Sequence, residues 1–271
     1  MALREYYLKW ERQFQQDSWP SAVPSSMIVT DNQQKWVRAR SICNYYLKNL
    51  SKSNNSLELQ RFLDFGCGAG HVAVAASRHV DRSVGYDISN HFVESFDYDY
   101  DQTKFLLTDD WKQVCKIPKY DTILLYDVLD HVKPGRIEAV FKTIASVCKP
   151  DTEVVVRCHP WTGPHGGHVY EKVNKAFAHF FMDDELLKKY QSEYVNKITR
   201  PMKVYGDWFN KYGFNVISRE VIRYPWNKAK NQELFCGDRQ DLMVELDMGD
   251  PQWQESVFMI EFVDYVLKYN G

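Results

Sequence analysis

Apolar residues recur at helical spacing in the first part of the chain. They are Trp36, Val37, Ile42, Cys43, Tyr46, Leu47 and Leu50. This spacing predicts an amphipathic helix of about four turns. The polar stretch at residues 51–56 predicts a loop after the helix. We therefore expect residues 1–57 to form a helical N-terminal extension.

Farther along, short apolar or β-branched runs alternate with helical patterns, which is typical of βαβ units and a parallel sheet. One helix is expected to begin at Pro134, because proline suits a first helical turn, and to end before Lys149. Another is expected to end at Gly213. The runs predict strands at residues 61–65, 83–86, 104–107, 122–126, 153–157 and 214–218, and a last strand within 257–267. The expected fold class is α/β, with a mostly parallel sheet of seven strands.

Two long stretches, residues 158–201 and 223–256, do not fit this alternation. Both follow predicted strands. We therefore expect them over the carboxyl edge of the sheet, where open α/β folds bind ligands. The expected organisation is one domain over residues 58–271 that carries these two stretches as insertions.

Composition narrows the class of protein. The chain has 271 residues, of which 44% are hydrophobic, and this excludes a disordered chain. Its 34 Lys+Arg and 36 Asp+Glu give a net charge of -2, which argues against a protein that binds a polyanion over its whole surface. No apolar run approaches the roughly 18 residues that span a bilayer, so we expect a soluble, cytoplasmic protein without a membrane segment. Aromatic residues reach 15%, a surplus that raises the question of a planar ligand.

A glycine-rich loop follows the first predicted strand. It contains Asp64, Gly66, Gly68 and Gly70, and a helix is expected from His71 on. Glycine permits a tight turn and lets a ligand lie against the backbone at the N-terminus of a helix. The spacing excludes the dinucleotide fingerprint G-x-G-x-x-G, since the third glycine comes one place early, and no Lys-Ser/Thr follows as in a Walker loop.

The loop resembles motif I of the class I S-adenosylmethionine-dependent methyltransferases, D-x-G-x-G-x-G. Further matches follow in order along the chain. They are Asp87 after the second strand, residues 108–111 after the third, residues 120–132 around the fourth, and Lys149-Pro150-Asp151 before the fifth, with Asp in place of the usual Gly. The resemblance implies a Rossmann-like, doubly wound fold and a methyltransferase with S-adenosyl-L-methionine as its cofactor.

The resemblance also implies which residues bind the cofactor. Asp87 is expected to hold the ribose, and either Asp109 or its neighbour Asp110 the adenine amino group. Trp111 either packs on the adenine or belongs to the core, and Tyr126 ends the strand that faces the transferred methyl group. The expected cofactor residues are Asp64, Gly66, Gly68, Gly70, Asp87, Asp109, Asp110, Trp111 and Tyr126.

Catalysis requires the acceptor to be held near the methyl group and, for some acceptors, to lose a proton. Asp127 and His131 follow the fourth strand, and the reference pKa of an imidazole lies near neutrality. We therefore consider His131 as a general base. The alternative is a capping or packing role.

A second candidate group follows the fifth strand, where His159, His165 and His168 lie close to Cys158 on a loop. Three interpretations compete: a metal site, acceptor recognition or acid/base chemistry, and a structural loop. Neither C-x2-C nor H-E-x-x-H spacing is present, so we expect no metal and favour the second interpretation. The six cysteines contain no CxxC pair, which argues against a zinc ribbon.

The acceptor itself stays open. Rings and cations are interleaved in and near the insertions, which suits a planar or anionic acceptor. The cations are Arg200, Lys203, Arg219, Arg223, Lys228 and Lys230. We expect methyl transfer to an oxygen or nitrogen of a small molecule. The alternatives are an RNA, DNA or cap-nucleotide methyltransferase, and a non-catalytic subunit with a methyltransferase fold. The oligomeric state is not indicated.

Overall fold

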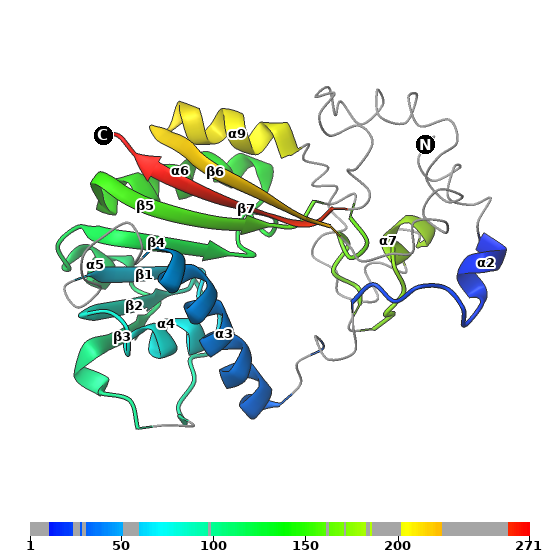
Figure 1. Ribbon diagram of the computed structural model, residues 1–271, viewed down its shortest axis with the longest axis horizontal. Helices are drawn as coiled ribbons and strands as arrows, with labels where there is room; N and C mark the ends of the chain where they lie inside the picture. Colours follow the sequence, from blue (N-terminus) through cyan, green and yellow to red (C-terminus); the bar gives the residue numbers. More distant parts are fainter. Residues whose placement is uncertain are drawn as a thin grey trace.

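A seven-stranded sheet forms the centre of the part of the chain that the computed structural model describes, namely residues 11–23, 28, 31–50, 60–96, 99–160, 163–170, 172–182, 185, 202–223 and 260–271. The strand order is β3-β2-β1-β4-β5-β7-β6 (Figure 1). The strands are β1 (Arg61–Phe65), β2 (Arg82–Tyr86), β3 (Phe105–Thr108), β4 (Tyr120–Tyr126), β5 (Cys148–Cys158), β6 (Phe214–Arg223) and β7 (Ile260–Tyr269). Strands β1 to β5 are parallel, whereas β7 is antiparallel to β5 and β6. The predicted α/β fold with a mostly parallel sheet is confirmed.

Helices lie on both faces of this sheet and beyond its carboxyl edge (Figure 1). They are α2 (Glu11–Gln15), α3 (Asn32–Leu50), α4 (His71–Ala76), α5 (Trp111–Cys115), α6 (Ile137–Val147), α7 (Ala178–Phe181) and α9 (Met202–Lys211). The short helices α2 and α7 are the ones that lie beyond the carboxyl edge. Short 3-10 helices span Gln102–Lys104 and Pro134–Arg136. Among the described residues, no helix is both long enough and apolar enough to cross a membrane.

Alternate residues of each strand face opposite layers of the core. On β1, Phe62 packs with residues of α3 and α4, whereas Leu63 packs with residues of α5 and α6. On β4, Leu124 faces the α3 layer and Ile123 the other layer. This period of two follows from the pleat of a strand. It also places Asp64, two residues after Phe62, on the side of α3 and α4.

Helix α3 completes one of the two helical layers. It begins at Asn32, earlier than the apolar spacing predicts, because Asp31 Oδ1 accepts a hydrogen bond of 2.7 Å from the Gln34 amide and caps the first turn. Trp36 is fully buried and stacks on Tyr100 at 5.5 Å. The predicted end of the extension at residue 57 and almost all of the insertion at 223–256 lie outside the described residues.

Several strands are longer than the apolar runs indicate. Strand β5 begins at Cys148, so the predicted turn at Lys149-Pro150-Asp151 lies within it. Asp151 has a φ of 69° there, the left-handed conformation that glycine adopts most easily. Strand β7 extends to Tyr269, beyond the predicted limit at residue 267. These strand ends are set by pairing with a neighbouring strand. The run of apolar residues in the sequence does not indicate that pairing.

Replacing Trp36 with alanine should lower the free energy of unfolding by about 3–5 kcal/mol, because a fully buried indole is removed from the contact between α3 and the sheet. Urea denaturation of the purified protein measures the loss. The control is Val37→Ala in the same helix turn, where the side chain is 55% exposed and the change should stay within about 0.5 kcal/mol. Equal stabilities of the two variants would contradict this role of α3.

Candidate active site

The candidate site residues gather at the carboxyl edge of the sheet. Strand order reverses between β1 and β4, and open α/β folds bind ligands at such a switch point. The ends of β1, β2 and β3 carry the residues predicted for the cofactor. The ends of β4 and β5 carry most of the ionisable residues predicted for catalysis. The structure therefore brings both groups to one edge.

The glycine loop is held by the end of β2. The amides of Gly66 and Cys67 both donate to the Tyr86 carbonyl oxygen, at 2.7 and 3.0 Å. Gly66, Gly68 and Gly70 have φ values of 77°, 54° and 88°. A Cβ on Gly66 would come within 2.6 Å of Val128, whereas a Cβ on Gly68 would meet nothing within 4 Å. The backbone at Gly68 is thus the part of the loop with open space beside it.

Asp87 lies directly against this loop. Its Oδ2 accepts a hydrogen bond of 2.8 Å from the Gly68 amide, and its Oδ1 accepts from the Ser89 amide at 3.0 Å and from the Ser89 hydroxyl at 3.1 Å. These bonds fix the carboxylate beside the open face of the loop. Two positions predicted for the cofactor, 19 residues apart in the chain, are therefore in contact.

The neighbours Asp109 and Asp110 differ in what they contact. Asp110 caps α5, since its Oδ1 accepts a hydrogen bond of 2.9 Å from the Lys112 amide. Asp109 is exposed and follows β3 directly. Trp111 is half-buried and packs edge-on against Tyr86, with ring centroids 5.0 Å apart. Its ring therefore combines core packing with an accessible face.

Sequence reasoning missed Ile88, the residue after Asp87. Its side chain is 91% exposed, which is unusual for a large apolar residue. The sequence does carry the signal, because Ile88 interrupts the polar residues that follow the second strand. An exposed apolar side chain beside the predicted ribose ligand is well placed to pack on a base.

Asp64 is the buried carboxyl group of the glycine loop. It is 2% exposed, and its Oδ2 accepts no hydrogen bond from any residue that the structure describes. Burial, with a smaller contribution from the nearby charge of Asp87, raises the pKa of Asp64 to about 7. Asp64 is therefore close to half protonated at neutral pH.

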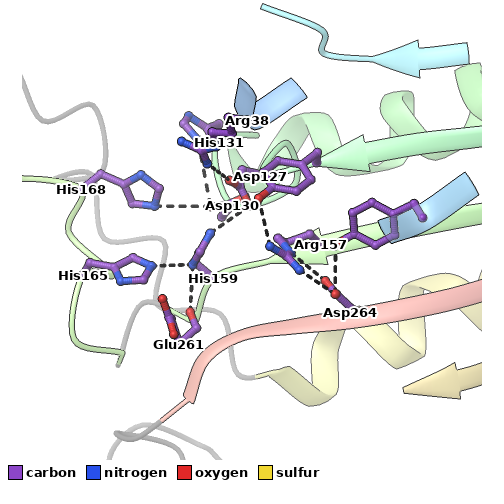
Figure 2. Close-up of polar contacts among 12 residues, drawn as sticks. Arg38, Asp127, Asp130, His131, Arg157, His159, His165, His168, Glu261 and Asp264 are labelled. Atoms are coloured by element: carbon purple, nitrogen blue, oxygen red, sulfur yellow. Dashed lines mark hydrogen bonds and ion pairs between the residues drawn. The ribbon is translucent and has the colours of Figure 1, made fainter. Parts of the chain in front are cut away.

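Asp127 begins the acceptor side of the site at the end of β4. Its φ is 56°, and its amide donates to the Arg157 carbonyl oxygen at 3.2 Å, so the side chain turns toward the end of β5. There its Oδ1 lies 2.8 Å from His159 Nε2 (Figure 2). Its Oδ2 lies 3.8 Å from the guanidinium of Arg38, on α3. Three elements thus converge on one carboxylate.

The ion pair sets the charges of both partners. Burial disfavours the imidazolium of His159, but the charge and hydrogen bond of Asp127, together with Asp130 and the Glu261 carbonyl, outweigh it and raise the pKa of His159 to about 9. Burial likewise disfavours the Asp127 carboxylate, but His159 and the arginines Arg157 and Arg38 hold its pKa below the usual value. At neutral pH the pair is an imidazolium and a carboxylate.

His165 has the opposite charge state. Its Nε2 lies 2.6 Å from His159 Nδ1, which also lies 2.8 Å from the Glu261 carbonyl oxygen (Figure 2). Burial and the positive charge of His159 lower the pKa of His165 well below its usual value. We therefore assign His165 as a neutral imidazole whose Nε2 accepts a hydrogen bond from His159 Nδ1–H, which the Glu261 carbonyl oxygen also approaches.

A third group consists of Asp130, His131 and His168. His168 Nε2 lies 3.4 Å from Asp130 Oδ2, and His131 Nε2 lies 4.0 Å from the same oxygen. Burial lowers the pKa of His131, although Asp130 opposes the shift, so His131 is neutral at pH 7. A neutral imidazole is able to accept a proton or to bind a metal ion. Cys158 instead belongs to the buried core, so it does not join the histidines.

Sequence reasoning also missed a network around Arg157 and Asp264. The two side chains form a double hydrogen bond of 2.8 and 2.7 Å across β5 and β7. Arg157 also donates to the Tyr126 hydroxyl at 2.9 Å, and the Tyr46 hydroxyl donates to Asp264 at 3.0 Å. Tyr126, predicted at the cofactor, is thus held by Arg157. No motif marks this pair, because the pairing of β5 with β7 joins residues 107 positions apart.

Two chain segments cover the edge of the sheet. Residues 11–23 pack on residues 172–182: Trp19 Nε1 donates to the Ala176 carbonyl oxygen at 2.8 Å, and Phe14 stacks on Phe181 at 4.2 Å. Figure 1 shows α2 and α7 beyond the carboxyl ends of β4 and β5. The Phe177 amide donates to the Pro164 carbonyl oxygen at 2.6 Å and so ties this cover to the histidine loop. Asp130, His159 and His168 are therefore largely enclosed, whereas His131 and Arg38 stay partly exposed.

Comparison with known proteins assigns the chain to a family. Residues 34–219 match the family described as "Methyltransferase domain". The chain therefore belongs to this family of S-adenosylmethionine-dependent methyltransferases. The resemblance stated from the motifs is confirmed, and with it the cofactor, S-adenosyl-L-methionine.

Individual relatives are distant. A thiocyanate methyltransferase of Brassica oleracea is 30% identical over 123 residues, which are 44% of this chain and 54% of that protein. The chain thus spans about half the length of this curated relative. The structure of a cyclopropane synthase from Mycobacterium tuberculosis has a TM-score of 0.52 and 16% identity, covering 98% of this chain and 93% of that chain. A magnesium protoporphyrin IX methyltransferase from Synechocystis, solved with bound SAH, has a TM-score of 0.46 and 16% identity, with 98% of both chains covered.

Asp87→Ala should weaken the binding of S-adenosyl-L-methionine at least about tenfold, or 1.4 kcal/mol, because it removes the carboxylate that lies beside the glycine loop. Isothermal titration calorimetry measures the affinity. The control is Asp81→Ala, an exposed aspartate just before β2, whereas Asp87 follows the same strand. Unchanged affinity in Asp87→Ala would refute the placement of the ribose at this carboxylate.

Proposed function

We propose that the chain transfers a methyl group from S-adenosyl-L-methionine to a small-molecule acceptor at the carboxyl edge of its sheet. The observation that carries the proposal is the position of the ionisable cluster. It lies next to the glycine loop and beneath the covering segments, with the side chains of Asp130, His159 and His168 only 9%, 12% and 14% exposed. A small molecule fits such an enclosed region far better than a folded macromolecule does.

The residues at the ends of β1 to β3 suit the cofactor. Gly68 leaves open space where any other side chain would stand, and Asp87 offers acceptor oxygens beside it. Asp109 and Ile88 are exposed at the same edge, and we assign the adenine amino group to the first and the face of the base to the second. When bound, S-adenosyl-L-methionine supplies an electrophilic methyl group on a sulfonium.

The acceptor side is assigned to the ends of β4 and β5. Asp127 is held from two sides, by His159 and by Arg38, so its carboxylate keeps one orientation. His159 is charged and both of its nitrogens are engaged, hence we assign it as a positioning residue rather than a base. Its role is to hold Asp127 in place beside the acceptor.

The curated relative supports a small acceptor. Its name states that it methylates thiocyanate, a small anion with nucleophilic sulfur and nitrogen. We retain an oxygen or nitrogen nucleophile as the predicted site of methylation and include thiocyanate among the acceptors to be assayed.

The arginines at the site do not favour a nucleic-acid acceptor. Arg38 and Arg157 are paired with Asp127 and Asp264, which leaves less of their charge for phosphates. Six cations motivated that alternative: Arg200, Lys228 and Lys230 lie outside the described residues, whereas Lys203 lies on α9 and Arg219 and Arg223 lie on β6. The set of Asp64, the glycines and Asp87 weighs against a non-catalytic subunit. Cytoplasmic localisation stays a prediction.

Incubation of the purified protein with S-adenosyl-L-methionine and single acceptors tests the proposal, with SAH measured by mass spectrometry. The acceptors are thiocyanate, small phenols, small amines and a capped RNA oligonucleotide. We expect SAH above the acceptor-free rate for at least one small molecule and none above it for the RNA. Turnover with the RNA alone would overturn the small-molecule assignment.

With the acceptor that reacts, His159→Gln should lower kcat at least about tenfold while the affinity for the cofactor is retained, because glutamine keeps the hydrogen-bonding shape but loses the positive charge. The control is His91→Gln, an exposed histidine outside the cluster. Thermal denaturation of both variants separates lost turnover from lost folding. An unchanged kcat in folded His159→Gln would refute the positioning role.

A further inference from the structure

Asp130, His131 and His168 bring three metal-binding side chains together. One nitrogen of each histidine and one carboxylate oxygen all lie within 4.8 Å of one another. Two of these distances are 3.4 Å, from His168 Nε2 to Asp130 Oδ2, and 4.0 Å, from His131 Nε2 to the same oxygen. Figure 2 shows both histidines directed toward Asp130 from different segments of the chain.

The Asp130 carboxylate is the unusual member of this group. Both of its oxygens are buried, and neither accepts a hydrogen bond within the part of the chain that the structure describes. A buried carboxylate without hydrogen bonds is costly, and native proteins nearly always satisfy such a group. Its Oδ2 lies 3.4 Å from His168 Nε2 and 4.0 Å from His131 Nε2, so both imidazoles are close to the same carboxylate. A bound cation would satisfy the carboxylate oxygens of Asp130.

The distances suit a compact metal site. Zinc bonds to histidine nitrogen and carboxylate oxygen are about 2.0–2.2 Å long, so the ligand atoms of a tetrahedral site lie roughly 3.4 Å apart. The contact between Asp130 and His168 already has this length. The His131 contact exceeds it by well under 1 Å, and the His131 side chain is 43% exposed, which leaves it room to rotate.

The backbone holds the ligands in place from two sides. The loop after β4 is tightened by a hydrogen bond of 3.0 Å from the His131 amide to the Val128 carbonyl oxygen. His168 has a φ of 51°, a left-handed conformation that a residue with a side chain rarely adopts, and such strain concentrates at ligand sites. Its amide donates to the His165 carbonyl oxygen at 2.8 Å.

We propose that Asp130, His131 and His168 bind one divalent transition-metal ion, for which Zn2+ is the best match to two imidazoles and one carboxylate. The spacing of the loop histidines alone did not predict this site, because two of its ligands come from the loop after β4. Three protein ligands leave a fourth position open. This step rests on the proposed function: an oxygen or nitrogen of the acceptor occupies that position, so the acceptor class is a small molecule with a lone-pair donor.

Zinc binding to the full chain tests the site independently of methyl transfer. The protein is dialysed against a chelator, the chelator is removed, and Zn2+ is titrated by calorimetry and by competition with a chromophoric indicator. We expect one ion per chain and a higher Tm with zinc. Replacement of Zn2+ by Co2+ should give the visible absorption bands of a four-coordinate site. Absence of stoichiometric binding to the wild-type chain would overturn the proposal, whatever the outcome of the methylation assay.

Variants then assign the ligands. His131→Ala should weaken zinc binding more than about 100-fold, since loss of a mere outer-sphere partner already costs 10- to 100-fold. Its half-exposed side chain makes loss of folding unexpected, and His168→Ala provides the second test. The control His91→Ala should bind zinc as the wild type does. If folded His131→Ala binds zinc with wild-type affinity, His131 is not a metal ligand, and the role of a general base is then the remaining assignment.

Discussion

The ion pair between Asp127 and His159 is the interaction on which the candidate site depends. It joins the ends of β4 and β5 over 2.8 Å, at the point where the strand order has just reversed. Asp127 reaches it only because its backbone turns left-handed after β4. Buried charges are tolerated when they are paired and further hydrogen-bonded, and here Arg38 and the Glu261 carbonyl complete the pairing.

The ion pair also gives His159 and His165 different charges. His159 is an imidazolium, and its charge helps to keep His165 neutral. Beneath this layer, Arg157 is fixed by Asp264 of β7. Burial by itself lowers the pKa of Arg157. The hydrogen bonds with Asp264 and the nearby tyrosines outweigh burial, so the pKa stays above its usual value. The acceptor side therefore contains several paired charges, and we place the metal ion at Asp130, where neither carboxylate oxygen accepts a hydrogen bond from a described residue.

The sequence predicts that the glycine loop and Asp87 lie together, but it does not predict the contacts at the ends of β4 and β5, and the reason is physical. The glycine loop and Asp87 are local to consecutive βα units, so spacing along the chain carries their arrangement. Arg38 and Asp264 reach the site through the docking of α3 and the antiparallel insertion of β7, which are long-range events without a local pattern. For the same reason Asp110 could not be separated from Asp109 until its capping bond to α5 was visible. The histidine loop was predicted as a group, but its division into an ion pair and a metal cluster depends on Asp127 and Asp130 from another strand.

The protonation state of His159 tests this account most directly. Two-bond 1H–15N correlation spectra of the full chain, labelled at histidine and assigned by His159→Gln, report whether each ring nitrogen carries a proton. At pH 7.5 the account predicts that both nitrogens of His159 are protonated, because its pKa is raised to about 9, while His165 keeps one bare nitrogen. A neutral His159 at this pH would contradict the ion pair, and with it the proposed organisation of the acceptor side.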